Sequence, residues 1–156
     1  MVSKHALRSS ETFSNTQNIV IDSILNIKYA EIKKYDISVN CKCRVPSEMN
    51  IEPMDLMVII GNLLDNAICA SKEVTDNKHI EIQITFDNSM IYIRVENTYV
   101  GRLNIDNERF LTTKSDKGMH GLGLSNVKKT VEKYHGNTNI HYTDKIFSVE
   151  VILYLE

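Results

Sequence analysis

The stretch KSDKGMHGLGLSNVKK, residues 114–129, holds three of the chain's six glycines. Gly118, Gly121 and Gly123 precede or enter a predicted helix, and glycine marks backbone that bends sharply or approaches something closely. Their exposed N–H groups and the positive end of the helix dipole favour an anion, to which Lys114 and His120 would add charge. The stretch therefore predicts phosphate binding, with a flexible hinge as the alternative. Its G-x-x-G-x-G spacing is neither the dinucleotide fingerprint nor the P-loop.

Two asparagines lie one helical turn apart in GNLLDNAICAS, residues 61–71. Asn62 and Asn66 therefore share one side of a predicted helix. Asparagine is a weak helix former, so two of them beside an apolar stripe require an explanation. One interpretation is that an amide oxygen completes the ligand shell of a Mg²⁺ whose other ligands are phosphates and waters. The alternative is that both side chains are solvated on an exposed face.

A third asparagine, Asn97, lies in VENTYVG, just past an alternating strand. Its side-chain carbonyl can accept a hydrogen bond from an adenine amino group. Taken alone, this residue is better explained as a turn former.

The apolar pattern predicts which elements position these residues. Helical spacing predicts helices at 15–34, from 53 to about 71, and at 122–134, the last ended by Gly136. Alternation predicts strands at 37–45, 80–86 and 91–95, then two closing strands that include 147–155. Residues 97–120 lack periodicity and are predicted to be a long loop, and loops of this length are usually functional or disordered.

This element order predicts an α+β fold. We expect a two-layer α/β sandwich, with helices on one face of a mixed, mostly antiparallel sheet. Residues 1–14 are predicted to be a linker or a frayed terminus, and residues 15–156 a single domain.

Composition narrows the class of protein. The chain has 156 residues, 42% hydrophobic, and a net charge of -2, which argues against nucleic-acid binding. No apolar run is long enough to span a membrane, so no membrane contact is expected. The three cysteines fit a reducing compartment. Cys41 and Cys43 continue the alternating apolar series of Ile37, Val39 and Val45, which indicates the buried face of a strand rather than a metal site.

Taken together, these segments resemble the Bergerat-fold (GHKL) ATPases. NLLDNA (62–67) is similar to their N box, VENT (95–98) lies where the first glycine box is expected, and GLGL (121–124) is similar to the second glycine box. RFLTTKS (109–115) resembles the segment before it, and the resemblance covers about residues 19–155. The pattern is most similar to sensor histidine kinases of the accessory gene regulator, peptide quorum-sensing type.

The resemblance implies two cofactors, ATP and Mg²⁺, and a role for each matched residue. Asn66 would be the Mg²⁺ ligand, Asn62 would act near the phosphates, and Asn97 would contact adenine. The remaining implied ATP-binding residues belong to an ATP lid and the helix after it: Lys114, Gly118, His120, Gly121, Leu122, Gly123 and Leu124.

Two departures from the family pattern carry chemical meaning. The D-x-G-x-G motif is absent and Asn97 stands where Asp is usual, so weak nucleotide affinity is expected because an amide is not a charged acceptor. Asn62 stands where hydrolysing members have Glu as general base. The resemblance therefore implies phosphoryl transfer to a protein, not efficient hydrolysis.

The implied partners lie outside this chain. A histidine kinase phosphorylates a histidine on a dimerisation domain and then a response regulator. Only His5 precedes the first predicted helix, with too few flanking residues to build that domain. We expect the cytoplasmic catalytic domain of a membrane-anchored kinase. An anti-sigma-factor-type serine kinase and a non-catalytic nucleotide-binding module are the alternatives.

Overall fold

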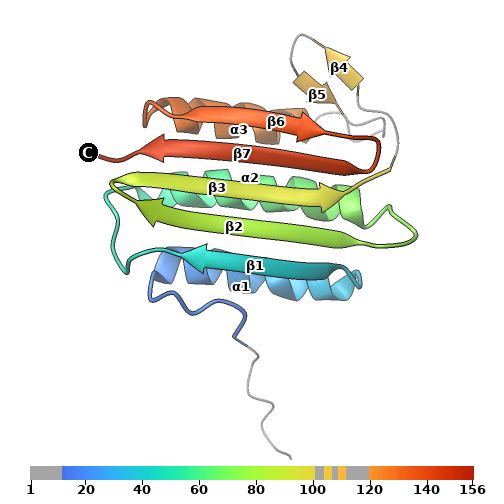
Figure 1. Cartoon of the computed structure of the whole chain (residues 1–156), viewed down its shortest axis with the longest axis horizontal. Helices are drawn as coiled ribbons and strands as arrows, with labels where there is room; N and C mark the ends of the chain where they lie inside the picture. The colour runs from blue at the N-terminus through green and yellow to red at the C-terminus, as the bar shows by residue number, and fades with distance from the viewer. Residues whose placement is uncertain (1–11, 101–103, 107–108, 112–119) are drawn as a thin grey trace, which may run out of the picture.

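The computed structural model describes residues 12–100, 104–106, 109–111 and 120–156, which form two layers (Figure 1). One layer is a five-stranded sheet in the order β1-β2-β3-β7-β6, in which β1 and β2 are parallel and the other neighbours antiparallel. These strands are β1 Ser38–Arg44, β2 His79–Asp87, β3 Met90–Thr98, β6 Asn137–Tyr142 and β7 Ile146–Tyr154. The other layer holds α1 Ile19–Lys34, α2 Pro53–Ser71 and α3 His120–Glu132. This arrangement confirms the predicted α+β sandwich.

The core lies between the layers. Residues alternate along β2 and β3, so that Ile80, Ile82 and Ile84 face the helices together with Ile91 and Ile93 of the next strand. The turn between these strands uses two residues of positive φ, Asn88 and Ser89, which matches the twist of a tight hairpin. The α2 residues buried against this face are Leu56, Ile59, Ile60, Leu63, Leu64, Ala67 and Ile68.

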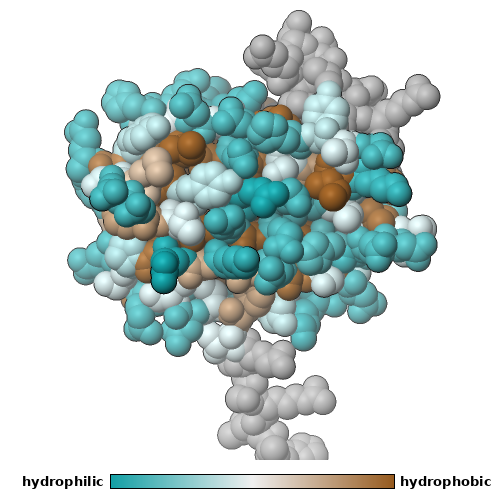
Figure 2. Space-filling view, viewed as in Figure 1, coloured by the Kyte–Doolittle hydropathy of each residue, from teal (hydrophilic) through white to brown (hydrophobic). Residues whose placement is uncertain are grey.

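The other face of the sheet meets solvent and is mostly hydrophilic (Figure 2). Its side chains pair across strands: Tyr92 Oη donates to Glu150 at 2.9 Å, and Arg94 lies 3.9 Å from the same carboxylate. His79 and Glu81 form a 2.8 Å contact along β2. The one-sided alternation of the strands follows from this difference between the two faces.

α2 is the central helix of its layer. Among the described helices, it is the one whose length and mean hydropathy of 1.3 would suffice to cross a membrane. Half of it is buried inside the protein, as expected for a core helix.

The structure differs from the sequence prediction between residues 97 and 120. β3 continues through Thr98, and β4 Asn104–Asp106 pairs with β5 Arg109–Leu111 as a separate two-stranded sheet. α3 begins at His120, two residues earlier than predicted. Strands of three residues are too short to give a periodic signal, which explains why the sequence predicted only a loop here.

The end of α3 corrects the role predicted for Gly136. The left-handed residue that ends the helix is His135, with φ of 53°. A Cβ at Gly136 would lie 2.0 Å from the Ile152 carbonyl oxygen and 2.8 Å from Val131. Glycine is therefore required there for close packing of β6 against β7 and α3.

The chain before α1 is packed against it. Phe13 stacks on Tyr29 with ring centroids 4.1 Å apart, and the Phe13 and Ser14 amides donate to Asn26 Oδ1 at 2.9 Å. Ser14 is buried and also donates to Asp22 at 2.7 Å. The packed region thus includes residues 13 and 14, which the sequence analysis placed in the linker.

Candidate functional site

α2 presents Asn62 and Asn66 toward α3. The helix begins at Pro53, whose fixed φ suits the first helical position. Because both asparagines lie at the border of the buried apolar stripe, their side chains are half-buried rather than solvated. Asn62 Nδ2 donates to the Val58 carbonyl at 2.7 Å, which fixes the orientation of this amide.

The first turn of α3 packs directly on these two amides. A Cβ added to Gly123 would lie 3.3 Å from Asn62 Oδ1 and 3.6 Å from Asn66 Oδ1. The first of these distances is tighter than ordinary van der Waals contact. Gly123 therefore meets two asparagines that lie far from it in the sequence, and its missing side chain permits this close approach.

The N-terminus of α3 also brings backbone donors to this place. An α-helix leaves the N–H groups of its N-cap and of its first three residues without intrahelical partners, and with α3 beginning at His120 those in the helix belong to residues 120–122. The positive end of the helix dipole adds to their attraction for an anion. Leu122 is 62% exposed, whereas Leu124 is buried in the core. The contact of Leu124 with ATP therefore stays a prediction, with its side chain packed in the core.

Asn97 lies at the end of β3, on the face of the sheet that α2 covers. Its side chain is 4% exposed, and Nδ2 donates to the Thr98 carbonyl at 2.9 Å. The same carbonyl accepts from Ser71 Oγ, at the end of α2, at 3.1 Å. Ser71 follows Asn66 by five residues, or about 7.5 Å along the helix. Asn97 is thus a buried strand residue near the asparagines of α2, and not the turn residue that its sequence context alone favoured.

Two predicted site residues, Lys114 and Gly118, lie outside the described residues. His120 and Gly121 belong to the described backbone of α3.

A polar contact that the sequence analysis missed lies at the other end of the helix pair, away from Asn62 and Asn66. It joins the first turn of α2 to the residues just after α3. Asp55 is buried, and it accepts hydrogen bonds from Tyr134 Oη at 2.5 Å and Lys133 Nζ at 3.1 Å. The Tyr134 bond, with the Lys133 charge, lowers the pKa of Asp55, and burial raises the pKa of Tyr134. An acidic residue inside an otherwise apolar helical stripe was the signal available in the sequence. This contact holds the residues just after α3 against the first turn of α2.

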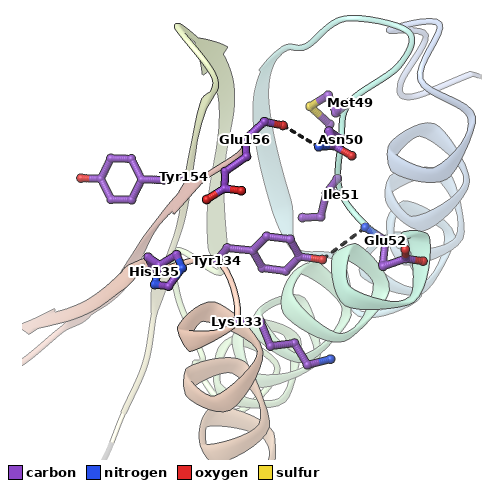
Figure 3. A pocket seen from close by; sticks show the side chains of 9 residues that line it. All are labelled: Met49, Asn50, Ile51, Glu52, Lys133, Tyr134, His135, Tyr154 and Glu156. Atoms are coloured by element: carbon purple, nitrogen blue, oxygen red, sulfur yellow. Dashed lines mark hydrogen bonds between the residues drawn. The ribbon is translucent and has the colours of Figure 1, made fainter.

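A cavity of about 360 Å³ lies at this same end, lined by residues 49–52 and 133–135, Tyr154 and Glu156 (Figure 3). Because α2 and α3 are antiparallel neighbours, it is at the far end of both helices from Asn66 and Gly123. It is therefore separate from the place where the asparagines and the glycine meet.

The cysteines of β1 face the core. Cys41 and Cys43 are half-buried free thiols, and burial raises their pKa values to about 11 and about 12. Both remain protonated at neutral pH and behave as small apolar residues, as predicted.

Comparison with known proteins identifies the family. A family model described as a GHKL domain matches residues 51–154. The chain belongs to the GHKL family. It is 34% identical over 91 residues to a probable C4-dicarboxylate sensor kinase of Halalkalibacterium halodurans, which covers 55% of the chain but only 17% of that relative. The chain therefore spans less than a fifth of the length of this relative.

Solved structures share the fold of this GHKL domain. The catalytic domain of histidine kinase ThkA, in a nucleotide-free form, superposes with a TM-score of 0.67 at 19% identity, covering 90% of this chain and 93% of that one. Acinetobacter baumannii histidine kinase AdeS gives 0.65 at 14% identity, covering 88% of this chain and 64% of that one. At these identities the likeness establishes the fold alone.

Proposed function

We propose that this GHKL domain is the ATP-binding catalytic domain of a sensor histidine kinase. It would transfer the γ-phosphoryl group of ATP to a histidine on the dimerisation domain of the same kinase. The observation that carries the proposal is the contact of Gly123, in the first turn of α3, with Asn62 and Asn66. That contact joins a helix N-terminus suited to phosphate with amide oxygens suited to Mg²⁺.

The donor set fits a magnesium ion that is held partly by nucleotide. Asn66 offers a neutral amide oxygen, and Mg²⁺ prefers oxygen ligands while taking its remaining positions from phosphates and waters. When bound, Mg²⁺ neutralises charge on the phosphates. The chain's own part is to position the nucleotide: Asn66 and Asn62 from one side, and the amides of residues 120–122 from the other. Lys114 and Gly118 are proposed to complete the phosphate contacts.

Asn97 is proposed to recognise adenine. Because Nδ2 is engaged by the Thr98 carbonyl, the amide oxygen is the atom directed elsewhere and is available to accept from the adenine amino group. An amide accepts a weaker hydrogen bond than a carboxylate, so we expect weaker nucleotide binding than in family members with Asp.

Asn62 favours transfer over hydrolysis. Its Nδ2 is bonded to Val58, and an amide cannot remove a proton from water. The rate of transfer then depends on positioning and on neutralisation of phosphate charge.

The partners of the domain, its location and its kinase type are proposed on the same basis. The partners would be the dimerisation and phosphotransfer domain of the same kinase, then a response regulator, and the domain would be the cytoplasmic part of a membrane-anchored protein. The LLDNA and HGLGL patterns, with Asn97 in place of Asp, support membership of the accessory gene regulator type.

Two measurements test this function. Calorimetry should detect binding of ADP and Mg²⁺-ATP by the 156-residue chain. Addition of the dimerisation domain should then give acid-labile phosphohistidine. An acid-stable serine label on a partner protein would instead indicate an anti-sigma-factor-type kinase, and no binding at millimolar nucleotide would indicate a non-catalytic module.

A further inference from the structure

The cavity at the far end of α2 and α3 has no part in the proposed phosphate site. Its volume of about 360 Å³ falls at the lower end of the range for small-molecule pockets. Three segments that are distant in the sequence form it: the loop before α2, the residues just after α3, and the end of β7 (Figure 3). Met49 and Ile51 supply apolar side chains to its lining. The folding of the chain therefore creates this pocket.

The Tyr134 side chain offers this cavity the face of its ring. Its hydroxyl is already engaged, because it donates to Asp55 at 2.5 Å and accepts from the Glu52 amide at 3.2 Å. The ring is only partly buried. Among the described residues, the cations that lie over aromatic rings are Lys33 and Lys72, and both are at other tyrosines. The ring face of Tyr134 is therefore open to a cation from outside the chain.

Two carboxylates of the lining have no cationic partner. Glu52 makes no capping bond to α2, and within the described part of the chain neither Glu52 nor Glu156 forms an ion pair. In Figure 3 the Glu156 side chain extends from the end of β7 toward the Tyr134 ring, whereas the Tyr154 side chain points away. A carboxylate beside an open aromatic face is an arrangement that attracts a cation.

The basic residues of the lining do not reverse this preference. Lys133 lines the cavity, but its ammonium group lies 3.1 Å from the Asp55 carboxylate and is neutralised by it. His135 is counted as neutral at pH 7. The carboxylates of Glu52 and Glu156 then remain in excess, so an anion would be repelled.

The N-terminus of α2 opens near this cavity, but it has little to offer an anion. The Glu52 amide donates to Tyr134, and Pro53 has no N–H. The amides of Asp55 and Leu56 both donate to the Glu52 carbonyl, at 3.0 and 3.2 Å. The donors that a helix N-terminus normally presents to a phosphate are therefore mostly occupied here.

We propose that this cavity binds an aliphatic ammonium or guanidinium group. The charged group lies between the Glu156 carboxylate and the Tyr134 ring, and the alkyl chain lies against Met49 and Ile51. The group belongs either to a free small cation or to a lysine or arginine side chain of a partner protein. Because the cavity is at the opposite end of both helices from Gly123, the cation binds without displacing nucleotide. The proposal does not rest on the proposed function.

An NMR titration of the 156-residue chain with putrescine tests this site. Butane-1,4-diol, which has the same length and no charge, is the control ligand. Signals of residues 49–52 and 133–135 should shift with putrescine and not with the diol, and high salt should weaken the binding. Nα-acetyl-lysine methylamide, which models a protein side chain, is titrated in parallel. Whichever of the two cations binds more tightly identifies the source of the group.

Variants separate the cavity from general surface charge. Glu156→Gln should weaken putrescine binding about fivefold, the upper end for an exposed ion pair. Asp144→Asn is the matched control, because Asp144 is exposed in the turn between β6 and β7, at the other end of the sheet (Figure 1). Tyr134→Phe keeps the ring and should bind as the original chain does. Tyr134→Leu removes the ring and should weaken binding up to about fivefold.

Three results would overturn the proposal. One is equal shifts with putrescine and the diol, and another is unchanged putrescine binding by Glu156→Gln. The third is competition between putrescine and ADP, which would place the cation at the nucleotide site. Failure of the proposed function is distinguishable, because it would appear as a chain that binds putrescine and does not bind ADP.

Discussion

At the scale of single residues, two glycines of the helix layer occupy opposite environments. A Cβ at Gly123 would lie 3.3 Å from Asn62 Oδ1, whereas one at Gly61 would meet nothing within 4 Å. The same substitution therefore has different consequences at the two sites.

We predict that Gly61→Ala raises the free energy of unfolding by about 0.5–1 kcal/mol, because alanine favours the helix interior. ADP affinity should stay unchanged in this variant. Gly123→Ala should instead weaken ADP binding, because the methyl group pushes α3 away from the asparagine amides. Thermal unfolding and calorimetry on both variants measure these effects. Equal ADP affinity in the two would contradict the site geometry.

Asn66 is predicted to matter for nucleotide binding and not for folding. Asn66→Ala should reduce the affinity for Mg²⁺-ATP about tenfold or more, because it removes the proposed metal ligand. The melting temperature should change little, since the side chain is only half-buried. Asn139→Ala, on an exposed position of β6, is the matched control. Unchanged Mg²⁺-ATP affinity would refute the metal assignment.

The Asn97 side chain donates to the Thr98 carbonyl, so the Asp that is usual in the family would cost stability here. Asn97→Asp replaces a donor with a carboxylate that faces the Thr98 carbonyl. We predict that the nucleotide-free protein loses about 1–3 kcal/mol of stability, as expected for a buried group without its hydrogen bond. ADP should raise the melting temperature of the variant more than that of the original chain, because a carboxylate is the stronger acceptor for adenine. An equal or smaller shift would argue against adenine recognition by this residue.

At the scale of the elements, the contact of Asp55 with Tyr134 and Lys133 holds α3 against α2. Tyr134→Phe should cost about 1.5–3 kcal/mol at pH 7, the usual value for a hydrogen bond to a charged group. The pKa of Asp55 is lowered from 3.8 in the folded protein, chiefly by the Tyr134 bond. A lowered pKa of Asp55 stabilises the folded protein above pH 3.8. That stabilisation disappears as the pH falls through the pKa that Asp55 has in the folded protein.

Denaturant unfolding of Tyr134→Phe and the original chain between pH 7 and pH 3 tests this contact. The difference in stability should be constant above about pH 5 and should shrink below pH 3.8. Tyr154→Phe is the control, because Tyr154 is exposed and should show no difference. A stability difference between the two proteins that grows toward low pH would contradict the assignment of the Asp55 carboxylate as the acceptor.

At the scale of the whole molecule, the packed domain extends further toward the N-terminus than its periodic sequence does. Asp22 accepts from Ser14 Oγ at 2.7 Å and from the Thr16 amide at 2.9 Å, and these bonds lower its pKa against the opposing effect of burial. Phe13 adds an aromatic stack on Tyr29. The segment from Phe13 to Asn18 therefore stabilises α1, although it precedes the first residue of the helix.

Two truncations test this boundary. A chain that begins at residue 12 should be as stable as the 156-residue chain. A chain that begins at residue 18 should lose at least about 2 kcal/mol, because the aromatic stack and several hydrogen bonds are removed. Urea denaturation measures both. Equal stability of the two truncations would show that residues 12–17 do not belong to the folded domain.

The sequence by itself determined the two-layer fold and the family. The β2 and β3 strands and the apolar stripe of α2 are local periodic patterns, so their faces could be predicted from spacing alone. The N box and the second glycine box could also be recognised from the sequence, because the residues of each motif are contiguous.

Only the tertiary structure decided which distant residues meet. The contact of Gly123 with Asn62 and Asn66 depends on how α3 crosses α2, and the buried position of Asn97 depends on pairing with β2 and β7. Gly136 and Asp55 likewise have roles set by partners far away in the chain. Periodicity reports which side of an element is buried. It contains no information about which residue lies opposite, because that depends on the packing of whole elements.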